Sequence, residues 1–342
     1  MSRRVVITGI GVVAPGGLGT KEFWSLLTSG RTATRAISLF PRVPVPLPDR
    51  RGSRLRPAAP RLHRRGRRAS RPRRPVRSGQ RRGSGNGLRG PSGVLVTEQA
   101  GGLDAVAQAR RQIRKGVRLL VTGGVDSSLC PWGWAAHLAG GELTEVADPA
   151  RAYLPFSEAA SGHVAGEGGA LLVLEDAAVA EARGARVYGT VAGCAATFDP
   201  APGSGGAPRL RAAAEQTLRE AGLAPADVDV VFADAAGRRD ADRAEAEAVA
   251  GMFGEYGVPV TAPKTMTGRL AAGGAALDLA AALLALRDQV IPPTAHVTAP
   301  AGDCPLDLVT ETRRPVGGLR TALVLARGRG GFNSAMVVRA AG

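Results

Sequence analysis

The sequence predicts an α/β fold made of two successive halves, each with a largely parallel or mixed sheet covered by helices. Three observations support this fold class. Short apolar runs of strand length alternate with longer segments of helical periodicity. The alternation occurs twice, before and after about residue 178. Hydrophobic residues make up 44% of the 342 residues, which is enough to build a substantial core.

The first half begins with an apolar run at residues 3–13, which predicts a buried strand, and Thr20 can cap the helix that follows. The motif Gly9-x-Gly11-x-x-Ala14 matches a dinucleotide-binding fingerprint, but the Pro-Gly-Gly at 15–17 delays the helix. We therefore interpret the motif as a tight turn after a core strand. The rest of this half should contain a strand at 93–97, a helix at 102–115 with Leu103, Val106 and Ile113 on one face, and buried strands at 118–123 and 168–175.

The second half repeats the alternation. The apolar runs at its C-terminal end predict two closing strands. Gly222 should end the first helix of this half, because glycine readily adopts the left-handed conformation of a helix C-terminus. We expect strands at 187–194, 228–234, 321–326 and 335–339, and helices at 209–221 and 277–288.

The net charge of +16 comes from one segment. Residues 42–89 contain 17 Arg, no Lys and a single acidic residue, Asp49. The whole chain has 45 basic and 29 acidic residues, so the remainder is balanced at 28 of each. A general nucleic-acid-binding surface is therefore excluded.

Three hypotheses remain for the Arg-rich segment: a frameshifted or otherwise corrupted stretch, a natural disordered linker, and a nucleic-acid-binding arm. The segment also has 7 Pro and 6 Gly and no periodic apolar pattern, so it cannot build a core. Only three Lys stand against 42 Arg in the whole chain, as a very GC-rich gene would encode. Any nucleic acid bound by the segment should be held nonspecifically and in a strongly salt-dependent way.

The three cysteines, Cys130, Cys194 and Cys304, are far apart in the sequence, and each is expected to be structural or incidental. No disulfide framework, metal site or resident cofactor is predicted, and the expected compartment is the cytoplasm. No apolar stretch approaches the roughly 20 residues that span a bilayer, so no membrane association is expected.

The most informative segment for chemistry is residues 94–104, Val-Leu-Val-Thr-Glu-Gln-Ala-Gly-Gly-Leu-Asp. A residue at a sharp turn between a strand and a helix N-terminus is well placed to act as a nucleophile, as cysteines do there. Gln99 occupies this place, and its amide can form hydrogen bonds but no thioester.

Five motifs follow one another along the chain: Gln99-Ala-Gly-Gly-Leu-Asp104, Val121-Thr-Gly-Gly-Val-Asp126, Pro131-Trp-Gly-Trp134, Pro263-Lys-Thr-Met-Thr-Gly-Arg269 and Gly330-Gly-Phe-Asn-Ser-Ala335. Together and in this order they resemble the chain-length factor, or ketosynthase β subunit, of type II polyketide synthases. The resemblance covers residues 1 to about 41 and about 88 to 342. It implies a thiolase-like duplicated αβαβα fold whose N-terminal half is incomplete. That half comprises residues 1–41 and 88–178 and is interrupted by the aberrant or disordered segment 42–87, and the C-terminal half comprises residues 179–342.

The resemblance also implies counterparts of the active site of β-ketoacyl synthases, which uses one Cys, two His and a supporting Lys. Gln99 stands at the Cys position, and Asp234 and Arg269 stand at the two His positions. Lys264 alone matches the catalytic pattern, and Arg329 takes the place of a gating Phe. We expect His163 to be a packed or loop histidine, we assign no chemistry to His296, and we expect Trp132 and Trp134 to be packing anchors.

The function implied is that of a non-condensing subunit that pairs with a ketosynthase α subunit as a heterodimer in aromatic polyketide, or antibiotic, biosynthesis. Substrates would arrive on the phosphopantetheine of an acyl carrier protein. An active β-ketoacyl synthase-type acyltransferase and an inactive product of a frameshifted gene are the alternatives. Gln99 argues against the first, and residues 42–89 argue for the second.

Overall fold

The computed structural model describes residues 3–35, 89–201, 204 and 206–341. The chain divides into two compact units, residues 1–41 with 95–342, and residues 42–94. Of the second unit, only residues 89–94 are described, and they contain no helix or strand. The hypotheses about the Arg-rich segment concern residues that lie outside the described part of the chain, except for Arg89.

The strands of the N-terminal half are β1 (Val5–Ala14), β3 (Leu119–Asp126) and β4 (Gly168–Asp176), with the short β2 (Gly17–Leu18) beside β1. They pair in the order β3-β4-β1, and all of these pairs are antiparallel. The predictions at 3–13, 118–123 and 168–175 are confirmed as strands. The prediction of burial at 118–123 is wrong, because β3 lies at the edge of the sheet and has no buried residue.

The C-terminal half continues the same sheet. Its strands are β5 (Gly189–Phe198), β6 (Val230–Phe232), β7 (Pro259–Thr261), β8 (Asp307–Leu308), β9 (Thr321–Gly328) and β10 (Phe332–Ala340). β5 pairs with β1, and the order continues β5-β10-β9-β6-β7-β8, with the last three strands parallel to β9. The sheet is therefore mixed, and the four strands predicted for this half are confirmed.

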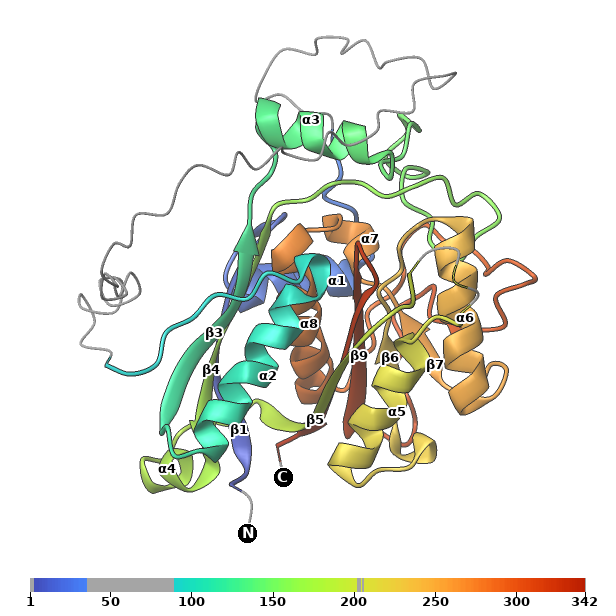
Figure 1. Cartoon of the computed structure of the whole chain (residues 1–342). Helices are drawn as coiled ribbons and strands as arrows, with labels where there is room; N and C mark the ends of the chain where they lie inside the picture. Colours follow the sequence, from blue (N-terminus) through green and yellow to red (C-terminus); the bar gives the residue numbers. More distant parts are fainter. Residues whose placement is uncertain (1–2, 36–88, 202–203, 205, 342) are drawn as a thin grey trace, which may run out of the picture. The chain divides into compact units, whose positions relative to one another are not determined.

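Two long helices lie at the centre of the fold. α2 (Gly101–Arg114) and α8 (Gly274–Asp288) pack against each other and contact strands of both halves (Figure 1). Every residue of α8 from Ala275 to Leu286 is buried, and Leu103, Val106 and Ile113 of α2 are fully buried. These side chains form one core with the inward faces of both parts of the sheet.

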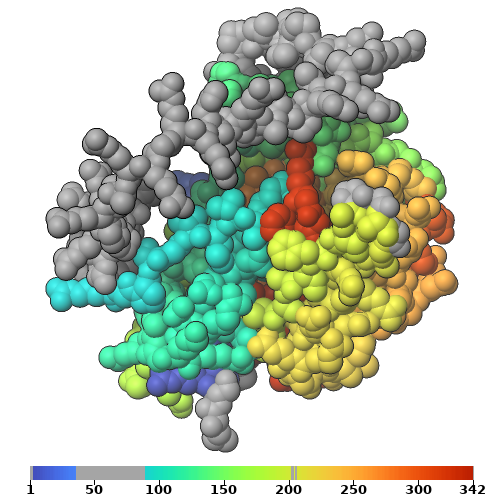
Figure 2. All heavy atoms as spheres, viewed as in Figure 1, coloured from blue at the N-terminus to red at the C-terminus, as the bar shows by residue number. Residues whose placement is uncertain are grey.

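A second core covers the opposite face of the C-terminal strands. α5 (Leu210–Ala221) packs on β5 and β10, and α6 (Arg239–Phe253) packs on α5. Gly222 ends α5 with φ of 67°, as predicted. In Figure 2 the red β9–β10 hairpin reaches the surface between α2, in teal, and α5, in yellow. The strands of this half are thus covered on both faces.

Shorter helices complete the described part of the chain. The helix after β1 is α1 (Thr20–Ser29), and Gly19, not Thr20, is its N-cap, so that part of the prediction is wrong. The others are η2 (Glu98–Ala100), α3 (Pro131–Gly140), α4 (Ala177–Ala182), η3 (Pro225–Asp227), α7 (Lys264–Thr267) and η4 (Ala271–Gly273). None of the described helices is long and apolar enough to cross a membrane.

Two further predictions about the N-terminal half are corrected. Gly9 and Gly11 do not form a turn but lie within β1, where a Cβ on Gly9 would touch Val173 of β4 at 2.8 Å. Residues 93–97 form no strand, and the side chains of Val94 and Val96 are more than 80% exposed. A strand needs a neighbour with which its backbone can pair, and these residues pair with none of the described strands.

Candidate functional site

Gln99 lies in a turn that leads directly into the central helix α2. Glu98 has a positive φ of 52°, which reverses the chain there, and Ala100 N donates to Thr97 O at 3.1 Å. Thr97 Oγ1 donates to Asp104 Oδ2 at 2.6 Å and so ties the turn to the first turn of α2. The turn at a helix N-terminus that was predicted for Gln99 is therefore present, although the strand before it is not.

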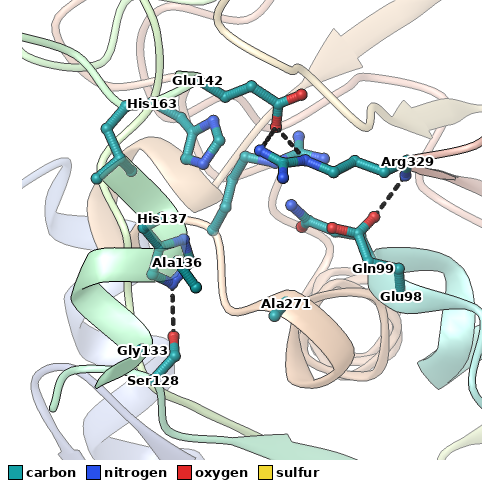
Figure 3. A pocket seen from close by; sticks show the side chains of 12 residues that line it. Glu98, Gln99, Ser128, Gly133, Ala136, His137, Glu142, His163, Ala271 and Arg329 are labelled. Carbon is teal, nitrogen blue, oxygen red and sulfur yellow. Dashed lines mark hydrogen bonds and ion pairs between the residues drawn. The ribbon is translucent and has the colours of Figure 1, made fainter. Parts of the chain in front are cut away.

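A cavity of about 230 Å³ opens beside this turn. Gln99, Arg269 and Arg329, three of the five predicted site residues, line it, although they come from distant parts of the sequence. Figure 3 shows Gln99 on one side of the cavity and two histidines on the other. The remaining lining residues are Glu98, Ser128, Gly133, Ala136, His137, Glu142, Leu143, His163 and Ala271.

Arg269 forms a buried ion pair with Asp234, another predicted site residue. Its Nη2 lies 3.1 Å from both carboxylate oxygens of Asp234, and its Nη1 donates to Asp234 O at 2.6 Å. Both side chains are about 95% buried or more. Burial alone would raise the pKa of Asp234, but the charges of Arg269 and Lys264 outweigh it and hold this pKa below its usual value.

Two carboxylates of α6 hold the backbone at Asp234 and in the residues directly after it. Glu245 accepts the N–H groups of Asp234 and Ala235 at 2.7 and 2.8 Å, and Asp242 accepts those of Phe156 and Gly237 at 3.0 Å. Burial raises the pKa of Glu245 to about 7 and that of Asp242 to about 6. The ion pair thus sits on a loop that the following helix fixes.

Lys264 lies at the start of α7 and is buried. Its Nζ is 2.8 Å from Asp278 Oδ2 on α8, and it does not line the cavity. Its charge nevertheless acts on Asp234. The structure thus brings Lys264 close to the ion pair, without placing it at the cavity wall.

Arg329 lies in the turn between β9 and β10. Its backbone N–H donates to Glu98 Oε2 at 2.6 Å, and its Nε and Nη2 lie 3.1 and 3.0 Å from Glu142 Oε2 (Figure 3). These contacts join the turn before α2, the β9–β10 turn and the segment after α3 at one side of the cavity.

His163 is buried, as expected for a packed histidine, but it also lines the cavity. Its backbone N–H donates to Glu142 O at 3.1 Å, and its ring packs near Tyr153 with 6.3 Å between the centroids. Burial, followed by the charge of Arg269, lowers its pKa to about 3, so the ring is neutral at neutral pH. His296 is exposed and does not line the cavity.

His137 and Ser128 also line the cavity, although they belong to none of the predicted site residues. Ser128 Oγ lies 2.6 Å from His137 Nε2. Trp134 packs edge-on near the imidazole of His137, with 6.4 Å between the ring centroids. Trp132 is 85% exposed, so its predicted role as a packing anchor is wrong: α3 buries none of its residues. The position of α3 brings Ser128 and His137 together, and their spacing in the sequence does not indicate the contact.

The cysteines do not contribute to the cavity. Cys130 accepts Gly133 N–H at 3.4 Å as the N-cap of α3, and burial raises the pKa of Cys194 and brings that of Cys304 to about 12. All three are free thiols. Among the described residues, no group of three or more His, Cys, Asp or Glu side chains is arranged to hold a metal ion.

Two family models match the chain. The model described as "Beta-ketoacyl synthase, N-terminal domain" matches residues 2–60 and 83–180, and the model described as "Beta-ketoacyl synthase, C-terminal domain" matches residues 188–298.

Several curated relatives come from Streptomyces. The "Actinorhodin polyketide putative beta-ketoacyl synthase 2" of Streptomyces coelicolor is 58% identical over 255 residues, and the tetracenomycin ketoacyl synthase beta subunit of Streptomyces glaucescens is 57% identical over 256. Each match covers 74% of this chain, but the chain spans only 62% of the length of these relatives. A polyketide beta-ketoacyl synthase 1 of Streptomyces cyaneus is 33% identical over 99% of this chain and 98% of its own length.

Solved structures share the fold. The complex of a type II PKS acyl-carrier protein with its ketosynthase bound to the hexaketide matches with a TM-score of 0.83 and 24% identity, and the ishigamide ketosynthase/chain length factor with 0.79 and 22%. Both matches cover all of this chain and all of the matched chain. The thiolase-like ketosynthase fold is thus confirmed. The chain belongs to the β-ketoacyl synthase family, and the Streptomyces relatives that match it at 57–58% identity are a polyketide beta-ketoacyl synthase 2 and a ketoacyl synthase beta subunit.

Proposed function

We propose that the chain acts as a non-condensing β subunit that pairs with a catalytic ketosynthase α subunit in aromatic polyketide biosynthesis. The observation that carries the proposal is the chemistry around Gln99. An amide stands at the position of the nucleophile, and the Asp234–Arg269 ion pair stands where the family's catalytic pattern has two imidazoles. The assignment of these counterparts rests on the motifs of the sequence.

The chemistry excludes condensation by this set of residues. Decarboxylative condensation needs a thiolate to hold one acyl chain and neutral donors to stabilise the enolate from the other. Gln99 forms no thioester. The guanidinium of Arg269 donates its hydrogen bonds to the Asp234 carboxylate and to the backbone carbonyls of Asp234 and Ala235. Because both side chains are buried, this ion pair is shielded from water. Another subunit must therefore supply the acyl-accepting thiol.

The matched structures support a proposal for the substrates and partners of the chain. One matched structure is described as an acyl-carrier protein in complex with its ketosynthase, and another as a ketosynthase/chain length factor. We infer that substrates reach the heterodimer on the phosphopantetheine of an acyl carrier protein, in the cytoplasm. The resemblance to chain-length factors further implies a role in setting the length of the product chain at the subunit interface.

Mass spectrometry of the chain co-expressed with a ketosynthase α subunit tests the proposal. After incubation with acyl-carrier protein loaded with an acyl group, we expect the two subunits to co-purify and the thioester-linked acyl group to sit on the α subunit. The peptide that contains Gln99, residues 90–110, should carry none. Stoichiometric acylation of that peptide would overturn the proposal.

A specific observation favours a second candidate, the inactive product of a frameshifted gene. β3 has no partner on its outer edge among the described strands. The outward side chains of Val121, Val125 and Leu171 are about half exposed. An uncovered apolar face favours aggregation. The DNA sequence tests this candidate. A shifted reading frame across codons 42–88 that encodes a strand and helix pattern would support the frameshift. A chain with the repaired segment should then be more soluble and bind the α subunit more tightly.

A further inference from the structure

Ser128 and His137 form a close pair inside the cavity that Gln99 lines. Their Oγ and Nε2 atoms are 2.6 Å apart (Figure 3), and both residues belong to the cavity wall. A hydroxyl within about 2.6–3.2 Å of an imidazole nitrogen is the arrangement in which a base activates a serine nucleophile. The proposed role of the chain as a non-condensing subunit does not use this pair.

The backbone holds the two side chains together. The first turn of α3 packs on the segment that carries Ser128, since a Cβ on Gly133 would collide with Ser128 O. His137 lies four residues after Gly133, so both face the same side of the helix. The Cys130 cap fixes the start of α3, and Trp134 packs near the imidazole. The contact is therefore a product of the local fold.

The protonation of His137 suits a base. Burial, followed by the positive charge of Arg329, lowers its pKa, so the ring is neutral at neutral pH. Three carboxylates, those of Asp126, Glu98 and Glu142, act in the opposite direction. They would stabilise the imidazolium once the ring takes up a proton.

We propose that Ser128 and His137 are a nucleophile and base that accept an acyl group from a thioester or an activated ester. With the ring proton on Nδ1, Nε2 takes the proton of Ser128 Oγ as Oγ bonds to the acyl carbon. Collapse of the tetrahedral intermediate breaks the carbon–sulfur bond, and the leaving thiolate takes the proton from His137. The products are an ester on Ser128 and a free thiol, and water can later hydrolyse the ester by the same route.

The cavity offers donors for the oxyanion that forms in this step. The Gln99 amide and the Arg329 guanidinium line the same cavity, and N–H groups of this kind stabilise charge that develops on a carbonyl oxygen. No carbon–carbon bond forms, so the reaction needs neither a thiol at position 99 nor an enolate. It adds acyl transfer to a subunit that does not condense.

A serine-directed fluorophosphonate probe, applied to the full chain, tests the pair. Peptide mapping separates residues 119–151, which contain Ser127 and Ser128, from residues 90–110, which contain Gln99. We expect the probe on Ser128, no labelling of that residue's peptide in Ser128→Ala, and labelling at least about 10-fold slower in His137→Gln, because general bases contribute about 10²- to 10⁴-fold. Ser127→Ala is the matched control: Ser127 is an exposed neighbour that donates to Glu167 at 2.7 Å, and its loss should change nothing.

An acetyl N-acetylcysteamine thioester then replaces the probe to test acyl transfer itself, with acetylation of Ser128 as the expected result. Thermal unfolding of each variant shows that the fold is kept. Absence of both adducts from Ser128 in the unchanged chain, or an unchanged rate in His137→Gln, overturns the assignment. An adduct on the Gln99 peptide would instead contradict the proposed function, so the two failures are distinguishable.

Discussion

The two halves of the sheet share one strand arrangement, but only the C-terminal half is complete among the described residues. There, antiparallel β5, β10 and β9 are followed by the parallel strands β6 and β7. In the N-terminal half, antiparallel β1, β4 and β3 repeat the first three places. No described strand takes the places of β6 and β7 beside β3.

The difference shows how the two faces of the sheet are covered in each half of the described chain. Neighbouring residues of β9, Leu323 and Val324, are buried in different cores on opposite faces of the sheet. On β4, Leu172 is fully buried but the neighbouring Leu171 is 47% exposed. Among the described residues, the N-terminal half is therefore covered on one face of β4 and left exposed on the other.

The largest effect should come from breaking the buried ion pair of the complete half. Arg269→Met leaves the Asp234 carboxylate buried without its partner and should cost about 3–5 kcal/mol of unfolding free energy. Arg211→Met is the control, because Arg211 forms an exposed pair with Glu215 at 2.7 Å, and its loss should cost under about 1 kcal/mol. Urea unfolding at pH 7 measures both. Equal costs would show that the buried pair does not stabilise this half.

Adjacent leucines of β4 separate the covered from the uncovered face of the incomplete half. Leu172→Ala creates a cavity in the central core and should cost about 2–5 kcal/mol. Leu171→Thr removes exposed apolar surface and should change stability by no more than about 0.5 kcal/mol, while it reduces self-association. Urea unfolding and light scattering measure the two effects. A similar loss of stability in both variants would mean that the outer face is covered.

A smaller effect should appear in the pH dependence of stability. His163 has a folded pKa of about 3, below its unfolded value of about 6.5, so the unfolded chain binds the proton more readily. The stability that its neutral ring contributes is present above pH 6.5 and is lost as the pH falls, by up to about 1.4 kcal/mol per unit. His163→Phe should therefore flatten the curve between pH 6.5 and 4, which urea unfolding across that range measures.

The exposed His296 serves as the matched control for that experiment. The buried carboxylates Asp242 and Glu245 remain in every variant, so their opposite contributions to the pH dependence cancel in the comparison. A His163→Phe curve as steep as that of the unchanged chain would show that this histidine is accessible to protons in the folded state.

The sequence predicted most elements because their signals are local. The periodicity of α2 and the glycine after α5 depend on nearby residues alone. The strand at 93–97 was predicted wrongly, because a strand depends on a partner far away in the sequence, and its alternating valines are equally compatible with an exposed segment.

The candidate site was predictable to a similar degree. Motifs marked Gln99, Arg269 and Arg329, and the structure places all three at one cavity. Asp234 and Lys264 lie behind this wall, held by Arg269 and Asp278. Ser128, His137 and His163 were not predicted as cavity residues, because their proximity comes from the packing of α3 and the following loop and from no pattern in their spacing. The catalytic roles of the predicted residues stay predictions.

The condensation activity of Gln99→Cys tests the central claim most directly. The new thiol at a helix N-terminus should accept an acyl group, but Asp234 and Arg269 still supply no neutral imidazole for the enolate. With an acyl thioester and malonyl-carrier protein, and without an α subunit, we predict an acylated variant and no β-ketoacyl product by mass spectrometry. Robust formation of that product by the single variant would contradict the account.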